Sequence, residues 1–304
     1  MKGCDDMIEL KNVKMSFEDF NALDGVDLTI EKGTAFGLLG SNGAGKSTIL
    51  RLLSGVYKQT EGEVLIDGEP VYDNVSAKEK VFFINDETVQ FGTMTLTDMK
   101  KYYQGFYPNF SEEIFNKLNS VIKLPEKKRL DKFSKGMKRQ AIVITGLACG
   151  TDYLLLDEAF DGLDPTMRII VKRMLVDAML DRKLTAIISS HNLKEINEVC
   201  DTAALLHQGK LLFNRDLDSV KGSIHKVQAV FDGDVTEKDF GDLQILSFEK
   251  NQSITYLIAR GTEEEIRAEL EKKSPKVLDL IPLTLEEIFI YEMEGMGYDF
   301  KGIE

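Results

Sequence analysis

Residues 40–48 read Gly40-Ser41-Asn42-Gly43-Ala44-Gly45-Lys46-Ser47-Thr48, and this stretch decides the fold of the chain. It fits the pattern G-x-x-x-x-G-K-[ST], in which glycines let the backbone bend so that successive N–H groups point at phosphate oxygens. The apolar run 35–39 before it is typical of a buried strand, and residues 49–53 after it have helical character. We therefore expect the whole loop to bind a nucleotide. Lys46 would reach the β- and γ-phosphates, and the Ser47 hydroxyl would bind Mg²⁺.

The composition indicates a globular, acidic protein. The chain has 304 residues, of which 43% are hydrophobic, enough for one large domain beside something smaller. A formal net charge of -13 repels phosphate backbones, so we expect no nucleic-acid partner. No apolar run approaches the roughly 20 residues of a membrane span, and residues 1–6 lack signal-peptide character. Three scattered cysteines favour a reducing compartment, so we expect a cytoplasmic protein.

Two later apolar runs end in side chains suited to phosphate chemistry. Residues 153–156 lead directly into Asp157 and Glu158. Beside a phosphate loop, the first acid could hold Mg²⁺, and the second could orient or deprotonate an attacking water. Residues 185–190 end at His191, which could meet a γ-phosphate at the carboxyl edge of a parallel sheet. The plain alternatives are strands that end in solvent and a structural histidine.

Residues 94 to about 148 have helical character and contain a second candidate anion site. There Ser134-Lys135-Gly136-Met137 precedes the apolar stretch 141–148. A serine and glycine loop that opens a helix attracts anions, because free N–H groups and the helix dipole both favour negative charge. Phe17 lies near the end of the first strand, where its ring could stack on a purine. From spacing alone, core packing is the better explanation for that ring.

Both ends of the chain predict strands. Apolar and polar residues alternate over residues 7–30, which is the period of half-buried strands. From about residue 215 the character changes to short strands and two helices, which open with capping boxes at 262–265 and 284–287. We expect a small, separate α+β unit over residues 216–304.

Taken together, these motifs resemble the ATP-binding subunit of a bacterial ABC transporter over about residues 7–215. The loop 40–48 resembles the Walker A loop, with Lys46 on the phosphates, and residues 153–157 resemble the Walker B strand. Glu158 falls at the catalytic glutamate, His191 at the switch histidine and Phe17 at the base-stacking aromatic residue. The resemblance implies an α/β P-loop NTPase domain over 1–215. Its RecA-like, mostly parallel core carries an antiparallel β subdomain and a helical subdomain at about 88–148.

The resemblance also implies the remaining ligands of ATP and Mg²⁺. The signature loop would bind nucleotide through Ser134, Lys135, Gly136 and Met137, although it reads Phe-Ser-Lys-Gly-Met where Leu-Ser-Gly-Gly-Gln is the commonest version. Metal ligands would be Ser47, Asp157 and Asp86, the last of which stands where the family has its Q-loop glutamine. Asp161 and Asp164 would contact a second subunit through the D-loop, in which Asp161 replaces the usual small polar residue.

The family's mechanism implies the partners. Two such subunits, identical or related, would pair head to tail around ATP and release each other after hydrolysis. This cycle would drive an integral membrane permease, which would hold the chain at the inner face of the cell membrane. The Ser-Lys-Gly-Met signature and the C-terminal unit resemble the drug- and antibiotic-export type.

Two other functions fit parts of the sequence. A soluble ABC-type ATPase that acts on ribosomes or nucleic acid is disfavoured by the single cassette and the negative charge. A small-molecule kinase with the same phosphate loop would leave the signature-like loop and the His191 strand unexplained.

Overall fold

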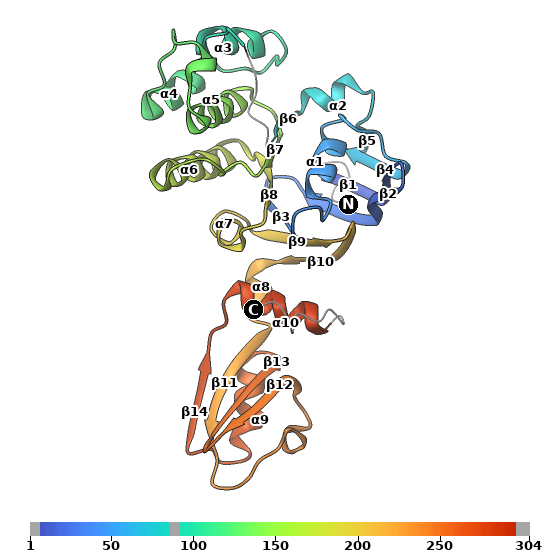
Figure 1. Ribbon diagram of the computed structural model, residues 1–304, viewed down its shortest axis with the longest axis vertical. Coiled ribbons are helices and arrows are strands. Elements are labelled where there is room, and N and C mark those ends of the chain that lie inside the picture. The colour runs from blue at the N-terminus through green and yellow to red at the C-terminus, as the bar shows by residue number, and fades with distance from the viewer. Residues whose placement is uncertain (1–6, 86–91, 296–304) are drawn as a thin grey trace. The chain divides into compact units, whose positions relative to one another are not determined.

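The computed structural model of the protein describes residues 7–85 and 92–295. The chain forms two compact units, Met1–Asn214 and Arg215–Glu304 (Figure 1). A six-stranded sheet and a four-stranded sheet belong to the first unit, and a further four-stranded sheet belongs to the second. Among the helices of the described residues, none combines the length and apolarity that a bilayer-spanning segment requires.

The six-stranded sheet carries the residues with candidate chemistry. Its spatial order is β10 (Lys210–Asp216), β9 (Thr202–His207), β3 (Ala35–Leu39), β8 (Thr185–Ser190), β7 (Tyr153–Asp157) and β6 (Val81–Ile84). Neighbouring strands from β9 to β6 run parallel, so their carboxyl ends lie at one edge of the sheet. Strands β3, β7 and β8 are buried along their whole length, as expected for strands covered on both faces. This explains their continuous apolar sequences.

The antiparallel sheet consists of β2 (Phe20–Glu31), β1 (Met7–Phe17), β4 (Glu61–Ile66) and β5 (Glu69–Pro70), in that order. Alternate residues of β2 are buried, which matches the apolar and polar alternation of its sequence. These buried residues share one core with α1 (Lys46–Leu53) and with the parallel sheet, through side chains such as Ile30, Ile49 and Tyr153. The helix after the phosphate loop is thus fixed between the two sheets.

The helical subdomain contains α3 (Leu96–Gln104), α4 (Glu112–Ile122), the short 3-10 helix η1 (Leu130–Lys132) and α5 (Lys135–Ala148). Side chains of Thr95, Ser111 and Ser134 cap the three α-helices by accepting hydrogen bonds from backbone N–H groups. Three other helices of the first unit flank the sheets: α2 (Val75–Glu79), α6 (Pro165–Arg182) and α7 (Leu193–Asn197). Pro165 at the first position of α6 favours a helix start there.

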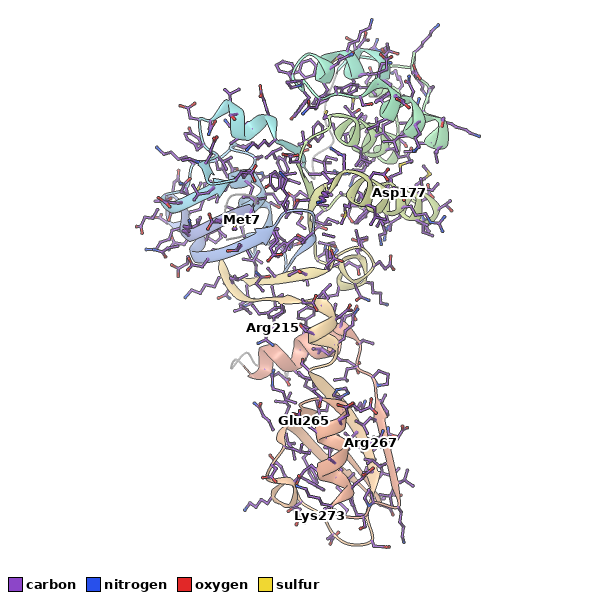
Figure 2. The ribbon with its side chains drawn as sticks, turned by 180° about the vertical axis from the view of Figure 1, so that it is seen from behind. Met7, Asp177, Arg215, Glu265, Arg267 and Lys273 are labelled. Carbon is purple, nitrogen blue, oxygen red and sulfur yellow. The ribbon has the colours of Figure 1, made fainter. Side chains whose placement is uncertain are left out.

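The second unit has an antiparallel sheet in the order β12 (Gln244–Asn251), β13 (Ile254–Arg260), β11 (Ile224–Val230) and β14 (Val277–Ile281). Its helices are α8 (Leu217–Lys221), η2 (Glu237–Phe240), α9 (Glu263–Glu271) and α10 (Leu285–Gly295). Ile266 and Leu270 of α9 join Val227 and Leu257 of the sheet in a separate apolar core. Figure 2 shows the charged side chains of Glu265 and Arg267 on α9, the two neighbours of the buried Ile266.

The fold prediction is confirmed: the chain has a mostly parallel core, an antiparallel subdomain, a helical subdomain and an additional C-terminal α+β unit. Both predicted C-terminal capping boxes form, since Thr262 and Thr284 exchange hydrogen bonds with Glu265 and Glu287. Asp86, the predicted third metal ligand, lies outside the described residues.

Candidate nucleotide site

The phosphate loop depends on glycine at specific positions. Gly45 has a φ of 110°, and a Cβ added there would lie 2.7 Å from Cδ2 of Leu23. Gly40 has a φ of 148°, and its Cβ would lie 2.4 Å from the carbonyl oxygen of Leu206. Both positions combine a left-handed backbone with close contacts that a larger residue would disturb. The glycines of the motif are therefore required by the turn that delivers the chain into α1.

Lys46 is the central cation of the site. Its side chain is buried, and Nζ donates to the carbonyl oxygens of Gly40 at 2.6 Å and Ser41 at 3.2 Å. The same ammonium lies 3.8 Å from Oε1 of Glu158. Burial lowers the pKa of Lys46, and the carboxylates of Glu158 and Asp157 oppose part of this shift. The ammonium is thus held by carbonyl oxygens of the phosphate loop and by the carboxylate of Glu158.

Asp157 forms a polar contact between the phosphate loop and the neighbouring strand. Its Oδ1 accepts hydrogen bonds from Oγ of Ser47 at 3.1 Å and from Oγ of Ser189 at 2.5 Å. Its Oδ2 is buried and has no hydrogen-bond partner among the described residues. A buried carboxylate oxygen without a partner costs free energy unless a ligand or cation satisfies it. Beside a serine hydroxyl and a phosphate loop, this oxygen fits Mg²⁺, which prefers oxygen ligands.

A Mg²⁺ ion bound by Asp157 and Ser47 would need oxygen ligands from the nucleotide as well. Among the described residues no group of three or more His, Cys, Asp or Glu side chains could hold a metal ion. Mg²⁺ in nucleotide sites is commonly bound by one or two protein ligands together with substrate phosphates and water. The pair of Asp157 and Ser47 agrees with that arrangement.

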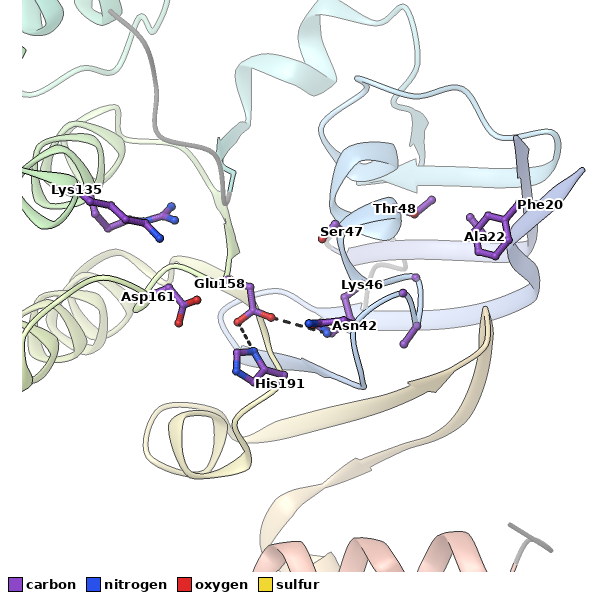
Figure 3. Close-up of a pocket in the computed structure, with 14 residues that line it drawn as sticks. Phe20, Ala22, Asn42, Lys46, Ser47, Thr48, Lys135, Glu158, Asp161 and His191 are labelled. Carbon is purple, nitrogen blue, oxygen red and sulfur yellow. Dashed lines mark hydrogen bonds and ion pairs between the residues drawn. The ribbon is translucent and has the colours of Figure 1, made fainter. Parts of the chain in front are cut away.

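Glu158 follows β7 with a left-handed backbone, at a φ of 46°, which turns its side chain toward the cavity. Its Oε2 lies 3.1 Å from Nδ1 of His191, and its Oε1 faces Lys46 (Figure 3). Burial raises the pKa of Glu158, while the hydrogen bond and charge of His191 and the charge of Lys46 partly offset the shift. A carboxylate with a raised pKa and a fixed orientation is suited to act as a general base.

A cavity of about 440 Å³ brings most of the predicted residues together. The residues that line it come from the phosphate loop, the β1–β2 hairpin, α5 and the ends of β7 and β8: Phe20, Ala22, Asn42, Gly43, Ala44, Gly45, Lys46, Ser47, Thr48, Lys135, Arg139, Glu158, Asp161 and His191. Figure 3 shows Lys46, Glu158 and His191 pointing toward one another within it. Phe20 and Arg139 are the notable members that the sequence did not predict.

The aromatic side of the cavity differs from the prediction. Phe20, which is 60% exposed, is among the described residues that line the cavity, and Phe17 is not. Phe17 is 39% exposed and packs edge-on against Tyr57, with ring centroids 5.3 Å apart. The two phenylalanines are cross-strand neighbours in the β1–β2 hairpin. The sequence signal for Phe20 was its position, three residues after Phe17 in the same hairpin.

Ser134 and Lys135 of the signature-like loop are exposed, and the serine has a local role. Oγ of Ser134 accepts the N–H of Met137 at 3.2 Å and so caps α5. Lys135 lines the cavity, whereas Ser134, Gly136 and Met137 are absent from the described lining. Asp161 also contributes to the lining, and Asp164 caps α6 by accepting the N–H of Met167 at 3.0 Å.

Comparisons with known proteins identify the family. A family model described as ABC transporter matches residues 23–161. The chain is 31% identical over 293 residues to the ABC transporter ATP-binding protein YtrB of Bacillus subtilis, an alignment that covers 95% of this chain and 99% of YtrB. It is 29% identical over 215 residues to the lantibiotic transport ATP-binding protein SrtF of Streptococcus pyogenes, covering 70% of this chain and 92% of SrtF.

A solved structure shows the same fold. It is a dimeric, post-hydrolysis state of an ATP-binding cassette bound to ADP and Pi, with a TM-score of 0.60 and 20% identity, and the match covers 69% of this chain and 98% of that one. The 31% identity to YtrB extends over nearly the full length of both chains, and it establishes the family on sequence grounds. The prediction of an ATPase subunit is thereby confirmed. This chain belongs to the ABC transporter family, as one of its ATP-binding ATPase subunits.

Proposed function

We propose that this chain hydrolyses ATP at the cavity above the phosphate loop, as half of a pair of subunits that drives a membrane permease. The observation that carries the proposal is the convergence of Lys46, Glu158 and His191. Oε1 of Glu158 lies 3.8 Å from Nζ of Lys46, and Oε2 lies 3.1 Å from Nδ1 of His191. A cation, a base and an imidazole are thereby brought together at one phosphate-binding loop.

Each of these groups has a separate part in the reaction. The loop amides and Lys46 neutralise charge on the transferring phosphoryl group. Glu158 accepts a proton from the attacking water, and His191 donates a hydrogen bond to the γ-phosphate. Ser47 and Asp157 hold Mg²⁺, which supplies further charge neutralisation when bound. The purine ring lies against the aromatic hairpin that carries Phe17 and Phe20, where stacking requires no hydrogen bond.

The second half of each site comes from a second copy or a close relative. Ser134 is exposed on the loop that opens α5, and the N-terminus of a long helix favours anions. A head-to-tail pair would place the Ser134 loop of one subunit against the triphosphate of the other, with Asp161 and Asp164 at the contact. Nucleotide then holds the pair together, and hydrolysis releases it.

The Ser134 contact can be tested without losing the helix cap. Ser134→Asp keeps an N-cap residue as favourable as serine, but it sets a carboxylate against the partner's triphosphate. In a Glu158→Gln background with ATP and Mg²⁺, we expect Ser134→Asp to abolish the dimer seen by light scattering while each monomer still binds ATP. Ser111→Asp, the same change at the cap of α4, should leave the dimer intact. A dimer of unchanged stability in Ser134→Asp would exclude this arrangement.

A permease would dock on an aromatic groove between α2 and α3. A hollow of about 360 Å³ is lined by Val75, Lys78, Glu79, Tyr102, Tyr103, Phe106 and Tyr107. Val75 and Phe106 are largely exposed, an arrangement suited to a partner that covers them. We assign the groove to a short amphipathic helix of the membrane subunit, which would insert apolar side chains between the rings.

This docking predicts a separable defect. Phe106→Ala should reduce co-purification with the membrane subunit while ATP hydrolysis by the purified chain stays unchanged. Val121→Ala, which removes an exposed apolar side chain from α4, serves as the matched control. Retention of the membrane subunit by Phe106→Ala would place the docking surface elsewhere. Through this partner the chain would be peripheral at the inner face of the cell membrane.

Export is the direction that we propose. The Ser134-Lys135-Gly136-Met137 signature and the C-terminal unit both resemble the drug- and antibiotic-export type, and SrtF is named for lantibiotic transport. Efflux of a labelled peptide antibiotic from vesicles that contain the whole transporter would test the direction.

A further inference from the structure

A buried carboxylate forms a hydrogen bond with the residue that precedes His191. Glu195 in α7 is only 6% exposed and forms two polar contacts through different oxygens. Its Oε2 accepts a hydrogen bond from Oγ of Ser190 at 2.9 Å, and its Oε1 lies 2.9 Å from Nη1 of Arg168. One side chain therefore connects the end of β8 with the first turn of α6.

The contact at Ser190 fixes the backbone on both sides of His191. Ser190 is the last residue of β8, and its Oγ also accepts the backbone N–H of Asn192 at 3.0 Å. Asn192 in turn caps α7, because its side chain accepts the N–H of Lys194 at 3.0 Å. The hydroxyl of Ser190 is buried, so these hydrogen bonds are protected from competition with water. The position of His191 follows from the position of Ser190.

The contact at Arg168 leads to the turn 161–164, which the family resemblance implies at the contact with a second subunit. The backbone N–H of Arg168 donates to the carbonyl oxygen of Asp164 at 2.9 Å. Nε of Arg168 is buried and has no hydrogen-bond partner among the residues that the structure describes. The Glu195 carboxylate is thus the partner that balances a partly buried guanidinium. Loss of either member would leave an uncompensated charge.

We propose that Glu195 is a positioning residue that sets the orientation of His191 and couples it to the 161–164 turn. The proposal rests on the proposed role of His191 in hydrolysis. When the turn moves, Arg168 moves with the start of α6, and the shared carboxylate transmits the displacement to Ser190. A displacement of about 1 Å at a catalytic group is enough to cost on the order of 100-fold in rate. Contact with a second subunit thereby regulates the geometry at the γ-phosphate.

The experiment measures ATP hydrolysis by the full chain with Mg²⁺. Glu195→Gln keeps the shape of the side chain but removes the charge that holds Arg168. We expect kcat to fall by about 10-fold to 100-fold, with KM for ATP within about twofold of the wild type. Glu198→Gln is the matched control, because Lys172 and Glu198 form an ion pair at 2.5 Å that also reaches from α6 to the end of α7 without touching Ser190. Its kcat should stay within about twofold of the wild type.

Combination with His191→Ala separates positioning from general damage. If Glu195 acts through His191, then Glu195→Gln should produce no further loss of kcat in the His191→Ala background. Equal fold losses in both backgrounds, or equal losses from Glu198→Gln and Glu195→Gln, would overturn the inference. Unchanged kcat in His191→Ala alone would overturn the proposed role of His191, and the inference with it. If Glu195→Gln does not fold, Ser190→Ala is measured in the same two backgrounds, with the same outcomes decisive.

Discussion

Replacement of Glu158 by glutamine tests the proposed chemistry most directly. The change keeps the size of the side chain but removes the proton acceptor. A positioned general base contributes about 10²-fold to 10⁴-fold, or about 2.7 to 5.4 kcal/mol of activation free energy. The neighbouring Asp157 cannot substitute, because its Oδ1 accepts two hydroxyl hydrogen bonds and its Oδ2 is buried. We therefore expect a loss in the upper half of the range, about 10³-fold to 10⁴-fold in kcat.

Binding and stability should respond differently from turnover. ATP affinity should stay within a few fold, since Lys46 and the loop amides are unchanged, and an ATP-bound dimer should accumulate. Burial raises the pKa of Glu158 despite two favourable neighbours, so its charged form is disfavoured by the folded state. This cost in folding free energy begins as the pH rises above the pKa of Glu158 in the unfolded chain. It is complete once the pH exceeds the raised pKa of Glu158 in the folded protein. The melting temperature of Glu158→Gln at neutral pH should therefore be no lower than that of the wild type.

The assay is phosphate release under single-turnover conditions, followed as a function of pH. Wild-type turnover should fall as the pH decreases through the raised pKa of Glu158, because only the carboxylate accepts the proton. Residual turnover by Glu158→Gln should lack this decrease. Glu113→Gln removes the same charge from an exposed position of α4 and should behave as the wild type. Turnover by Glu158→Gln within about 10-fold of the wild type would refute the assignment of the base.

Three other predictions concern binding. Phe20→Ala should weaken ATP binding by about 5-fold to 150-fold, the equivalent of about 1–3 kcal/mol of stacking. Titration calorimetry of Phe20→Ala and Phe17→Ala side by side shows which ring supports the base. Asp157→Asn should raise the Mg²⁺ concentration for half-maximal hydrolysis by about 10-fold or more, and a Mg²⁺ titration of Asp86→Ala tests the second proposed carboxylate. Gly45→Ala should abolish ATP binding and lower the melting temperature, because its φ of 110° costs about 1–3 kcal/mol for a residue with a Cβ. ATP binding by that variant at wild-type affinity would contradict the geometry of the loop.

The sequence predicted best where chemistry is local. The loop 40–48 contains its own backbone requirements, and the structure places its Lys46, Ser47 and Thr48 at the cavity. Asp157 and Glu158 were also predictable, because two acids at the end of an apolar strand have a chemical use beside a phosphate loop. Capping boxes such as Thr262 with Glu265 depend on three-residue spacing, and they form as predicted.

The sequence predicted least where residues act across elements. Nothing in the sequence relates Arg168 to Glu195, because the contact depends on how α6 packs beside α7. The choice between Phe17 and Phe20 depends on the twist of one hairpin and on Tyr57 from another segment. The spacing of residues along the sequence predicts neither the Arg168 contact nor the choice between the two phenylalanines. Such contacts follow from packing between elements, which a single sequence does not encode in a readable pattern.

Strand order supplies what the motifs leave undetermined. In the sheet, β8 lies between β3 and β7, with Leu39 opposite Ser190 and Ser189 opposite Asp157. Because all three strands are parallel, the phosphate loop, His191 and the two acids leave the sheet at one edge. The central place of β8 brings His191 to Glu158, whose carboxylate lies between Lys46 and the imidazole, and it places the Ser189 hydroxyl against Asp157. Each motif could form in another strand order, but only neighbouring parallel strands bring the cation, the base and the imidazole into contact. Function therefore depends on topology as much as on the motifs themselves.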